Sequence, residues 1–230
     1  NGIDNVINYF KILMVTLCFS GTALSAADGP RILAMGDSFL ATHAVKKQAV
    51  PDALSKLLKE PVLNNSVTGA RIIYRLPLTG SLGLNIGKQF RGGTWDWIVL
   101  NGGGNDLMLG CGCNRCDQKL NQMISKDGKR GEIPRMVAKL RATQARIAYV
   151  GYLRSPGVSS LIEGCRDEGD ELEARLAKLA KRDKGVWFVS LADLVPTGDR
   201  SFHSADMVHP SPKGSAAAAA RIAKVILRNR

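Results

Sequence analysis

Three short stretches of this sequence carry residue types that together could perform nucleophilic acyl transfer. Residues 36–39 read Gly-Asp-Ser-Phe, residues 103–106 read Gly-Gly-Asn-Asp, and residues 206–210 read Asp-Met-Val-His-Pro. A fourth and weaker stretch, residues 65–69, reads Asn-Ser-Val-Thr-Gly. Such chemistry needs a nucleophile, donors to an oxyanion, a general base and a carboxylate that orients the base. Each stretch alone is a weak signal, and it is their combination that predicts a site.

Ser38 is the predicted nucleophile. A serine hydroxyl is a weak nucleophile at its ordinary pKa and needs an adjacent base to remove its proton. Ser38 follows a predicted strand at a strand-to-helix turn, where its hydroxyl can project and its backbone N–H can face a substrate oxygen. The alternative for a lone Gly-Asp-Ser stretch is an ordinary helix N-cap, since Asp and Ser both favour that position.

His209 is the predicted general base, and Asp206 is the predicted carboxylate that orients it. Asp206 stands three residues before His209, so its side chain can reach the imidazole, fix its tautomer and stabilise the imidazolium that forms. The alternative is a surface loop with incidental polar residues. The two other histidines, His43 and His203, lack such a pattern, and we expect no catalytic role for them.

The predicted oxyanion donors are the side-chain amide of Asn105 and the backbone N–H groups of Ser38 and Gly69. Donors aimed at the developing negative charge are a general requirement of acyl transfer. The glycines at residues 102–104 let the backbone approach a ligand closely and adopt unusual dihedral angles. For Gly69 the alternative is a plain turn glycine.

The elements that must position these residues alternate along the chain. We expect strands at residues 31–35, 61–65, 97–101, 146–152 and 186–190, and helices at residues 44–59, 167–183 and 212–227, the first interrupted at Pro51. Near-continuous apolar strands that alternate with helices predict a parallel sheet covered on both faces. Ser38, Gly69 and Asn105 each follow one of the first three strands, at the edge where such sheets form their sites.

Together, these motifs resemble those of the SGNH hydrolases, the GDSL-type esterases and lipases, over about residues 31–228. The resemblance implies a flavodoxin-like three-layer α/β/α fold with a five-stranded parallel sheet and no metal or other cofactor. It implies that Ser38, Gly69, Asn105 and His209 are the four residues for which the family is named, with Asp206 as the carboxylate. The implied reaction is ester hydrolysis through an acyl-enzyme on Ser38.

The sequence leaves the substrate open. One class is acyl esters, as in lysophospholipases, thioesterases and arylesterases, and the other is acetyl groups on carbohydrate. An alternative of another kind is a non-catalytic binding domain that kept the fold and lost the reaction. The residues that would line an acyl pocket come from loops that the sequence pattern does not place.

Residues 1–26 have the pattern of a secretory signal peptide, which leaves residues 27–230 as the hydrolase domain. Lys11 precedes the apolar residues 12–19, and small residues then lead to an Ala-x-Ala-like site before Ala27. The alternative is a membrane anchor, but the apolar run is shorter than the roughly 20 residues that a spanning helix needs. The pattern therefore predicts a secreted or periplasmic protein without a stable membrane span.

Four cysteines remain after such a cleavage: Cys111, Cys113, Cys116 and Cys165. An even number of cysteines in an exported protein favours disulfides, and four allow three pairings. The alternative is a four-cysteine zinc site, for which the spacing lacks two matched Cys-x-x-Cys pairs. We expect a disulfide to Cys165 to hold the cysteine loop against the segment after the fourth strand, beside the pocket. Alternatively, the disulfides only stabilise a long surface loop.

The chain is basic, with a formal net charge of +12 from 32 Lys and Arg against 20 Asp and Glu. Half of this excess lies in residues 115–146, where nine basic residues face Asp117, Asp127 and Glu132; the nine are Arg115, Lys119, Lys126, Lys129, Arg130, Arg135, Lys139, Arg141 and Arg146. This predicts either attraction to anionic surfaces or a solvated helix face. Aromatic residues make up only 6% of the chain and no recognition motif is present, which argues against nucleic acid as a partner.

Overall fold

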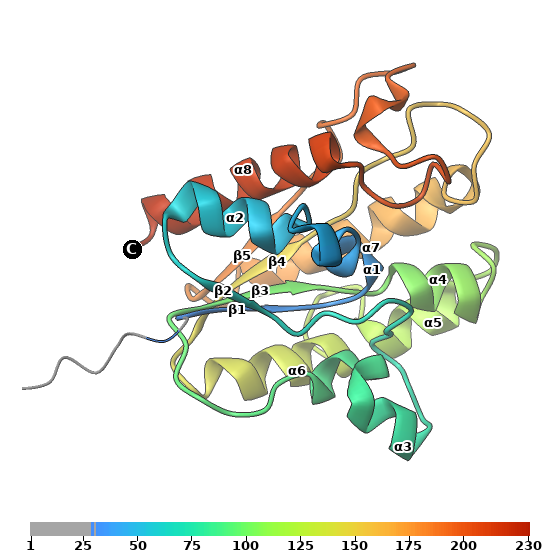
Figure 1. The fold of residues 1–230 in the computed structure, drawn as a ribbon. Coiled ribbons are helices and arrows are strands. Elements are labelled where there is room, and N and C mark those ends of the chain that lie inside the picture. Colours follow the sequence, from blue (N-terminus) through green and yellow to red (C-terminus); the bar gives the residue numbers. More distant parts are fainter. Residues whose placement is uncertain (1–28, 30) are drawn as a thin grey trace, which may run out of the picture.

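Five strands form one parallel sheet in the computed structural model, which describes residue 29 and residues 31–230 (Figure 1). They are Ile32–Met35 (β1), Val62–Asn64 (β2), Trp97–Asn101 (β3), Arg146–Val150 (β4) and Val186–Val189 (β5). Each lies within one of the five ranges predicted from the sequence, so the predicted sheet is confirmed. The predicted signal peptide lies outside the described residues. Within the described part of the chain, no helix combines the length and the apolar character needed to span a membrane.

The strand order is β2-β1-β3-β4-β5, which is the order of flavodoxin-like folds. After β1 the chain moves outward to β2, and it then returns to the other side of β1 to form β3, so that Ala34 pairs with Asn64 on one side and with Val99 on the other. In open α/β sheets the crevice at such a reversal is where ligands bind. The segments that follow β1 and β3 therefore flank the expected site.

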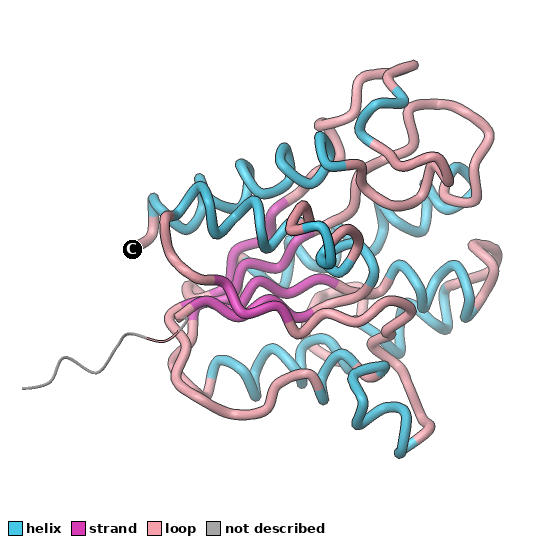
Figure 2. The backbone as a smooth tube through the Cα atoms, viewed as in Figure 1, coloured by secondary structure: helices cyan, strands magenta, loops and turns pink. Residues whose placement is uncertain are grey.

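Helices cover both faces of the sheet (Figures 1 and 2). One face carries Ser38–Ala41 (α1), Val50–Leu58 (α2) and Pro212–Arg228 (α8), and the other carries Gly104–Gly110 (α4), Asp117–Met123 (α5), Glu132–Arg141 (α6) and Arg166–Ala180 (α7). The segment between β2 and β3 holds the short helix Pro77–Thr79 (α3), the π-helical turn Gly80–Leu84 and the 3₁₀ turn Ile86–Lys88. Further 3₁₀ turns are Ala44–Lys46, Glu163–Cys165 and Arg200–Phe202.

Alternate residues of each central strand belong to two separate hydrophobic cores. In β3, Ile98 and Leu100 pack in the core beneath α4 to α7, whereas Trp97 and Val99 pack in the core beneath α2 and α8. Successive side chains of a strand point to opposite faces, so a sheet covered on both sides needs apolar residues at every position. This is why the strands are nearly continuous apolar runs in the sequence.

The helix predicted over residues 44–59 is wrong in its first part. Residues Ala44–Lys46 form a separate 3₁₀ turn, flanked by left-handed backbone at His43 and Lys47, and α2 begins only at Val50. Pro51 lies in the first turn of α2, where its missing N–H has no intrahelical acceptor to lose. The proline therefore helps to begin the helix and does not interrupt one.

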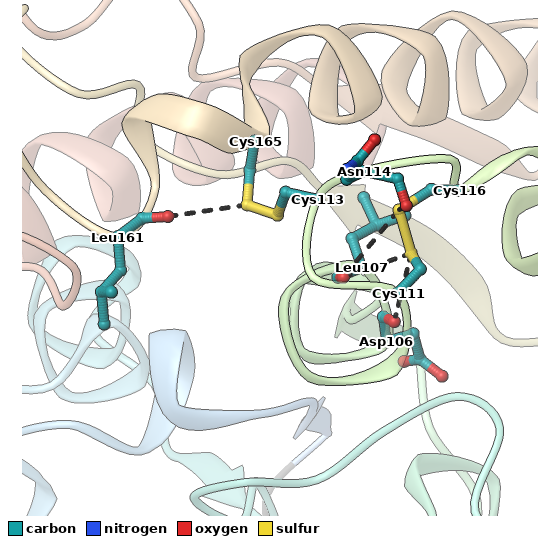
Figure 3. Close-up of a disulfide and its surroundings, with 8 residues drawn as sticks. All are labelled: Asp106, Leu107, Cys111, Cys113, Asn114, Cys116, Leu161 and Cys165. Atoms are coloured by element: carbon teal, nitrogen blue, oxygen red, sulfur yellow. Dashed lines mark hydrogen bonds between the residues drawn. A yellow bond between two sulfur atoms is a disulfide. The ribbon is translucent and has the colours of Figure 1, made fainter.

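The four cysteines form two disulfides, Cys111–Cys116 and Cys113–Cys165 (Figure 3). The second joins the segment that follows α4 to the 3₁₀ turn before α7, so the prediction that a disulfide reaches Cys165 is confirmed. Because all four sulfur atoms are bonded in pairs, they do not supply the thiolates of the zinc site considered as an alternative.

Candidate active site

The turn after β1 presents Ser38 at the start of α1. Asp37 is the N-cap of this helix, since its Oδ1 accepts a hydrogen bond of 2.9 Å from the N–H of Phe39. The N-cap interpretation of the Gly-Asp-Ser stretch therefore applies to Asp37. The Ser38 hydroxyl makes no hydrogen bond to any described residue, and Ser38 lines a cleft at the carboxyl edge of the sheet.

Gln89 also holds the turn after β1, through two hydrogen bonds to the backbone of Gly36. Its Oε1 accepts from the N–H of Gly36 at 2.7 Å, and its Nε2 donates to the carbonyl of the same residue at 2.8 Å. Gln89 is only 2% exposed, and it stands 53 residues along the chain from Gly36. This two-way contact fixes the backbone immediately before the candidate nucleophile.

His209 and Asp206 form a close pair, with His209 Nδ1 lying 2.6 Å from Asp206 Oδ2. The N–H groups of Val208 and His209 both donate to Asp206 Oδ1 at 3.0 Å, so the turn holds its own carboxylate. Burial opposes the ionisation of Asp206, but the hydrogen bonds from His209 and Val208 outweigh it and lower the pKa of Asp206 to about 2. An Nδ1–H that donates to this carboxylate leaves Nε2 to accept a proton.

A short antiparallel contact holds the loop that carries His209. His203 pairs with Pro210, and the N–H of Ser204 donates to the carbonyl of His209 at 2.8 Å. His43 Nε2 lies 3.2 Å from the Ser204 hydroxyl, which donates to the Pro210 carbonyl at 3.0 Å. Neither His43 nor His203 lines the cleft. Both histidines instead contact the loop that carries His209, His203 through its backbone pairing with Pro210 and His43 through the Ser204 hydroxyl.

Asn105 lies at the beginning of α4 and lines the same cleft as Ser38 and His209. Its Nδ2 donates to the carbonyl of Ala70 at 3.0 Å, which uses one of the two amide hydrogens and leaves the other for a ligand. Gly102 and Gly103, just before the helix, have φ values of +156° and +110°, the unusual dihedral angles expected of this run.

Gly69 lies next to the residue that Asn105 contacts, but it does not itself line the cleft. It adopts φ +79°, and no heavy atom lies within 4 Å of the position that a Cβ would take there. Neither the N–H of Gly69 nor that of Ser38 donates to a described residue. These two backbone donors and the Asn105 amide are therefore all available to an incoming oxygen.

Asp106 ties the Asn105 turn to the segment after Gly69. Its two carboxylate oxygens accept from the N–H groups of Ile72 at 2.9 Å and Ile73 at 2.8 Å. Burial raises the pKa of Asp106 to about 6, although both backbone hydrogen bonds act in the opposite direction. The fourth residue of the Gly-Gly-Asn-Asp stretch thus holds together the two segments that carry Gly69 and Asn105.

The cleft is mainly apolar and has a volume of about 100 Å³. Ser38, Asn105 and His209 contribute polar groups to it, and Tyr152 and Cys165 also line it. Its apolar lining comes from segments that follow several strands: Phe39, Leu107, Met108, Leu153, Ile162, Leu172 and Val208. An apolar cleft with a few convergent polar groups is the usual form of a small-molecule site.

Comparison with known families identifies the family to which the chain belongs. The model of the GDSL-like lipase/acylhydrolase family matches residues 34–217, which include all of the motifs described above. The chain belongs to this family. It is therefore a member of a family of hydrolases, with the α/β/α fold of the SGNH type.

Solved structures of this fold resemble the chain over most of its length. A protein from Slackia heliotrinireducens assigned to the SGNH hydrolases is 21% identical, with a TM-score of 0.61, covering 86% of this chain and all (100%) of its own. An extracellular lipase from Streptomyces rimosus is 16% identical, with a TM-score of 0.59, covering 88% of this chain and 100% of its own. A member of a carbohydrate acetylesterase family from Sinorhizobium meliloti is 16% identical, with a TM-score of 0.61, covering 87% of this chain and 98% of its own.

At these identities the likeness establishes the fold and leaves the substrate open. No curated protein matches the sequence significantly.

Within this GDSL-type chain, sequence reasoning missed three contributors to the site. Gln89 and Tyr152 lie outside every motif, and Asp106 lies inside a motif that does not by itself indicate a role for it. Tyr152 follows β4 by two residues, and its aromatic ring at the carboxyl edge of a strand was the available signal. No local pattern in the sequence distinguishes Gln89.

Proposed function

We propose that the protein hydrolyses carboxylic esters, with Ser38 as nucleophile, His209 as general base and Asp206 as the carboxylate that orients His209. The observation that carries this proposal is that Ser38, Asn105 and His209 line one cleft while His209 Nδ1 lies 2.6 Å from Asp206. A nucleophile, a base and an oriented partner are the parts of a Ser-His-Asp triad, which is recognised by geometry and roles.

In the first step, His209 Nε2 takes the proton of Ser38 as Oγ attacks the ester carbonyl carbon. The carbonyl oxygen becomes an oxyanion, which accepts hydrogen bonds from the N–H groups of Ser38 and Gly69 and from the free amide hydrogen of Asn105. The tetrahedral intermediate collapses, the C–O bond to the alcohol breaks, and His209 gives its proton to the leaving alkoxide. The products of this step are the free alcohol and an acyl-enzyme on Ser38.

In the second step, water attacks the acyl-enzyme and gives a proton to His209. The bond between the acyl carbon and Ser38 Oγ breaks, and His209 returns the proton to Ser38. The ionised Asp206 stabilises the imidazolium in both steps. No redox partner or cofactor enters this balance.

The size and lining of the cleft favour a short acyl group. An apolar cavity of about 150 Å³ binds benzene, so a cleft of about 100 Å³ has room for a few carbon atoms. The apolar lining suits the hydrocarbon part of an acyl chain. This lining supports acyl esters as the first candidate substrates, with thioesters and aryl esters as further substrates of the same chemistry.

A carbohydrate O-acetyl esterase is the second candidate function. Acetyl is the smallest acyl group with a methyl to bury, which agrees with the volume of the cleft. The similar fold of the Sinorhizobium meliloti acetylesterase family member is compatible with this alternative. A panel of esters that varies acyl length, with and without a sugar as the alcohol, separates the two candidates by their kcat/KM values.

We also propose that residues 1–26 direct export and that residues 27–230 act as the hydrolase domain in a secreted or periplasmic location. The leader-like sequence supports this, and so do the two disulfides, because disulfides persist in oxidising compartments.

The direct test of the reaction is Ser38→Ala assayed on a short p-nitrophenyl ester. We expect activity to fall to background while the circular dichroism spectrum is retained, because only the nucleophilic oxygen is removed. Ser81→Ala is the matched control, since Ser81 is exposed beyond α3 and does not line the cleft. Undiminished hydrolysis by the Ser38 variant would refute the proposed function. Folded wild-type protein that hydrolyses no ester would also refute it, and would favour the alternative of a non-catalytic binding domain.

A further inference from the structure

Tyr152 joins the two turns that carry the candidate nucleophile and the candidate oxyanion donor. Its hydroxyl donates to Oδ2 of Asp37 at 2.6 Å and accepts from the N–H of Gly104 at 3.0 Å. Asp37 directly precedes Ser38, and Gly104 directly precedes Asn105. One hydroxyl therefore bridges segments that follow β1 and β3, although Tyr152 itself follows β4.

The packing around the ring sets the position of this hydroxyl. A Cβ on Gly104 would lie 2.9 Å from Cζ of Tyr152, so the close approach of the Asn105 turn requires glycine. The ring of Phe39 meets that of Tyr152 edge-on, with 5.7 Å between their centroids. Phe39 and Gly104 thus contact Tyr152 from the two turns that its hydroxyl connects, and Tyr152 also lines the cleft.

Asp37, the acceptor of this hydrogen bond, is a carboxyl group with only 2% exposure. Burial raises the pKa of Asp37, while the Tyr152 hydroxyl, the N–H of Phe39 and the charge of His209 lower it. Asp106 and Tyr149 also interact electrostatically with Asp37, whose charge raises the pKa of both groups. Burial also raises the pKa of Tyr152 well above its ordinary value, so its hydroxyl remains a donor.

We infer that Tyr152 is a positioning residue of this active site, holding the Ser38 and Asn105 turns in register and donating to the carboxylate of Asp37. The inference rests on the proposed ester hydrolysis. In that reaction the nucleophile and the oxyanion donors must be placed within a fraction of an ångström of one another.

The test is Tyr152→Phe, which keeps the ring and removes the bridging hydroxyl. We expect kcat on a short p-nitrophenyl ester to fall about 10- to 100-fold, because misplacement of the two turns acts on the transition state. KM should change much less, since the ring still lines the cleft. The acid limb of the pH profile of kcat/KM should move to higher pH, because the Asp37 carboxylate that caps the Ser38 turn loses a donor that favours its charged form.

Tyr149→Phe is the matched control. Tyr149 is buried, and its hydroxyl donates to the carbonyl of Gly102 at 3.0 Å, but it makes no hydrogen bond to Asp37. Both variants lose one buried hydroxyl and should lose similar thermal stability. Only Tyr152→Phe should shift the acid limb, and in an Asp37→Asn background that shift should vanish. A shift of equal size in both tyrosine variants, or in neither, overturns the inference.

A readout independent of activity separates this inference from the proposed function. Carbon-13 NMR titration of the Asp37 carboxyl should show a higher pKa in Tyr152→Phe than in the wild type. An unchanged Asp37 pKa overturns the inference even if esters are hydrolysed, whereas wild-type protein that hydrolyses no ester overturns the function alone. Should Tyr152→Phe fail to fold, Asp37→Asn must show the same loss of kcat, and wild-type kinetics in that variant overturn the inference.

Discussion

At the scale of single residues, the Asp206–His209 pair is the part of the site most fully anticipated from the sequence. The two residues stand three positions apart, so a single turn of chain brings the carboxylate to the ring, and the backbone of the same turn holds it. Local spacing is enough to predict such a contact. By contrast, the hydroxyl of Tyr152 reaches Asp37 across 115 residues, and only the folded sheet brings them together.

Asp206→Asn should lower kcat about 10³- to 10⁴-fold, because an amide no longer fixes the tautomer or stabilises the imidazolium. Asp199→Asn is the control: this carboxylate caps the nearby 3₁₀ turn, its pKa is also about 2, and it does not line the cleft. Steady-state kinetics of both variants provide the check. Similar kcat values for the two variants would remove Asp206 from the triad.

The pH dependence of stability is a further prediction at this scale. The pKa of Asp106 is about 6, above its ordinary value of 3.8, so the folded protein binds this proton more tightly than the unfolded chain. Its contribution to the free energy of unfolding is full below about pH 4 and is lost as pH rises through about 6, amounting to about 3 kcal/mol. Asp106→Asn should lack this slope in urea unfolding between these pH values. If the free energy of unfolding depends on pH in the same way in the variant and the wild type, the raised pKa of Asp106 is contradicted.

At the scale of elements, the sequence predicted all five strands. The signal was clearest for β1, β3 and β4, because these strands are nearly continuous apolar runs. The boundaries of helices were less predictable. Left-handed backbone at His43 and Lys47 separates the turn Ala44–Lys46 from α2, and neither residue type signals such a conformation strongly. The pairing of the cysteines was also undetermined, because it depends on how the loop after α4 lies against the segment before α7.

The Cys113–Cys165 disulfide should matter more than Cys111–Cys116 for both stability and substrate binding. It closes a loop with a sequence separation of 52, whereas Cys111–Cys116 closes one of 5. The loss of conformational entropy in the unfolded chain then corresponds to about 4 kcal/mol of stabilisation for the first and about 2 kcal/mol for the second. Cys165 lines the cleft, so the paired substitution Cys113→Ser and Cys165→Ser should also raise KM by increasing the ordering cost of binding. Cys111→Ser with Cys116→Ser is the control. Equal KM values in both double variants would show that the disulfides only stabilise the surface loop.

At the scale of the whole molecule, the flavodoxin-like fold was implied by the family resemblance, whereas the apolar pattern predicted only a parallel sheet covered on both faces. That pattern is the same whether β3 pairs with β1 or with β2; the observed register, with Ala34 between Asn64 and Val99, depends on the packing of the complete sheet. This order brings Ser38 and Asn105 to one crevice. The sequence pattern thus predicts that the motifs share one edge of the sheet, and the strand order decides which of them flank the same crevice.

Net charge is the other property of the whole molecule with a testable consequence. Within residues 115–146, Lys129, Arg135 and Arg141 form ion pairs with Asp127, Glu132 and Asp183, so part of this basic stretch is locally compensated. The chain as a whole keeps a charge of +12.

We expect kcat/KM for an anionic ester to fall as ionic strength rises from about 0.01 M to about 0.15 M, where the screening length shrinks from about 30 Å to about 8 Å. A neutral ester of the same acyl group should not respond. The same salt response for both esters would exclude electrostatic attraction of substrate.

The central claim is that Ser38 is an activated nucleophile, and covalent labelling tests it most directly. A fluorophosphonate probe reacts with the hydroxyl of a serine that a neighbouring base activates, and peptide mapping by mass spectrometry locates the adduct. We predict one adduct, on Ser38, with labelling lost in Ser38→Ala and strongly slowed in His209→Ala. An unlabelled Ser38 in folded wild-type protein, or an adduct on another residue, would contradict the account.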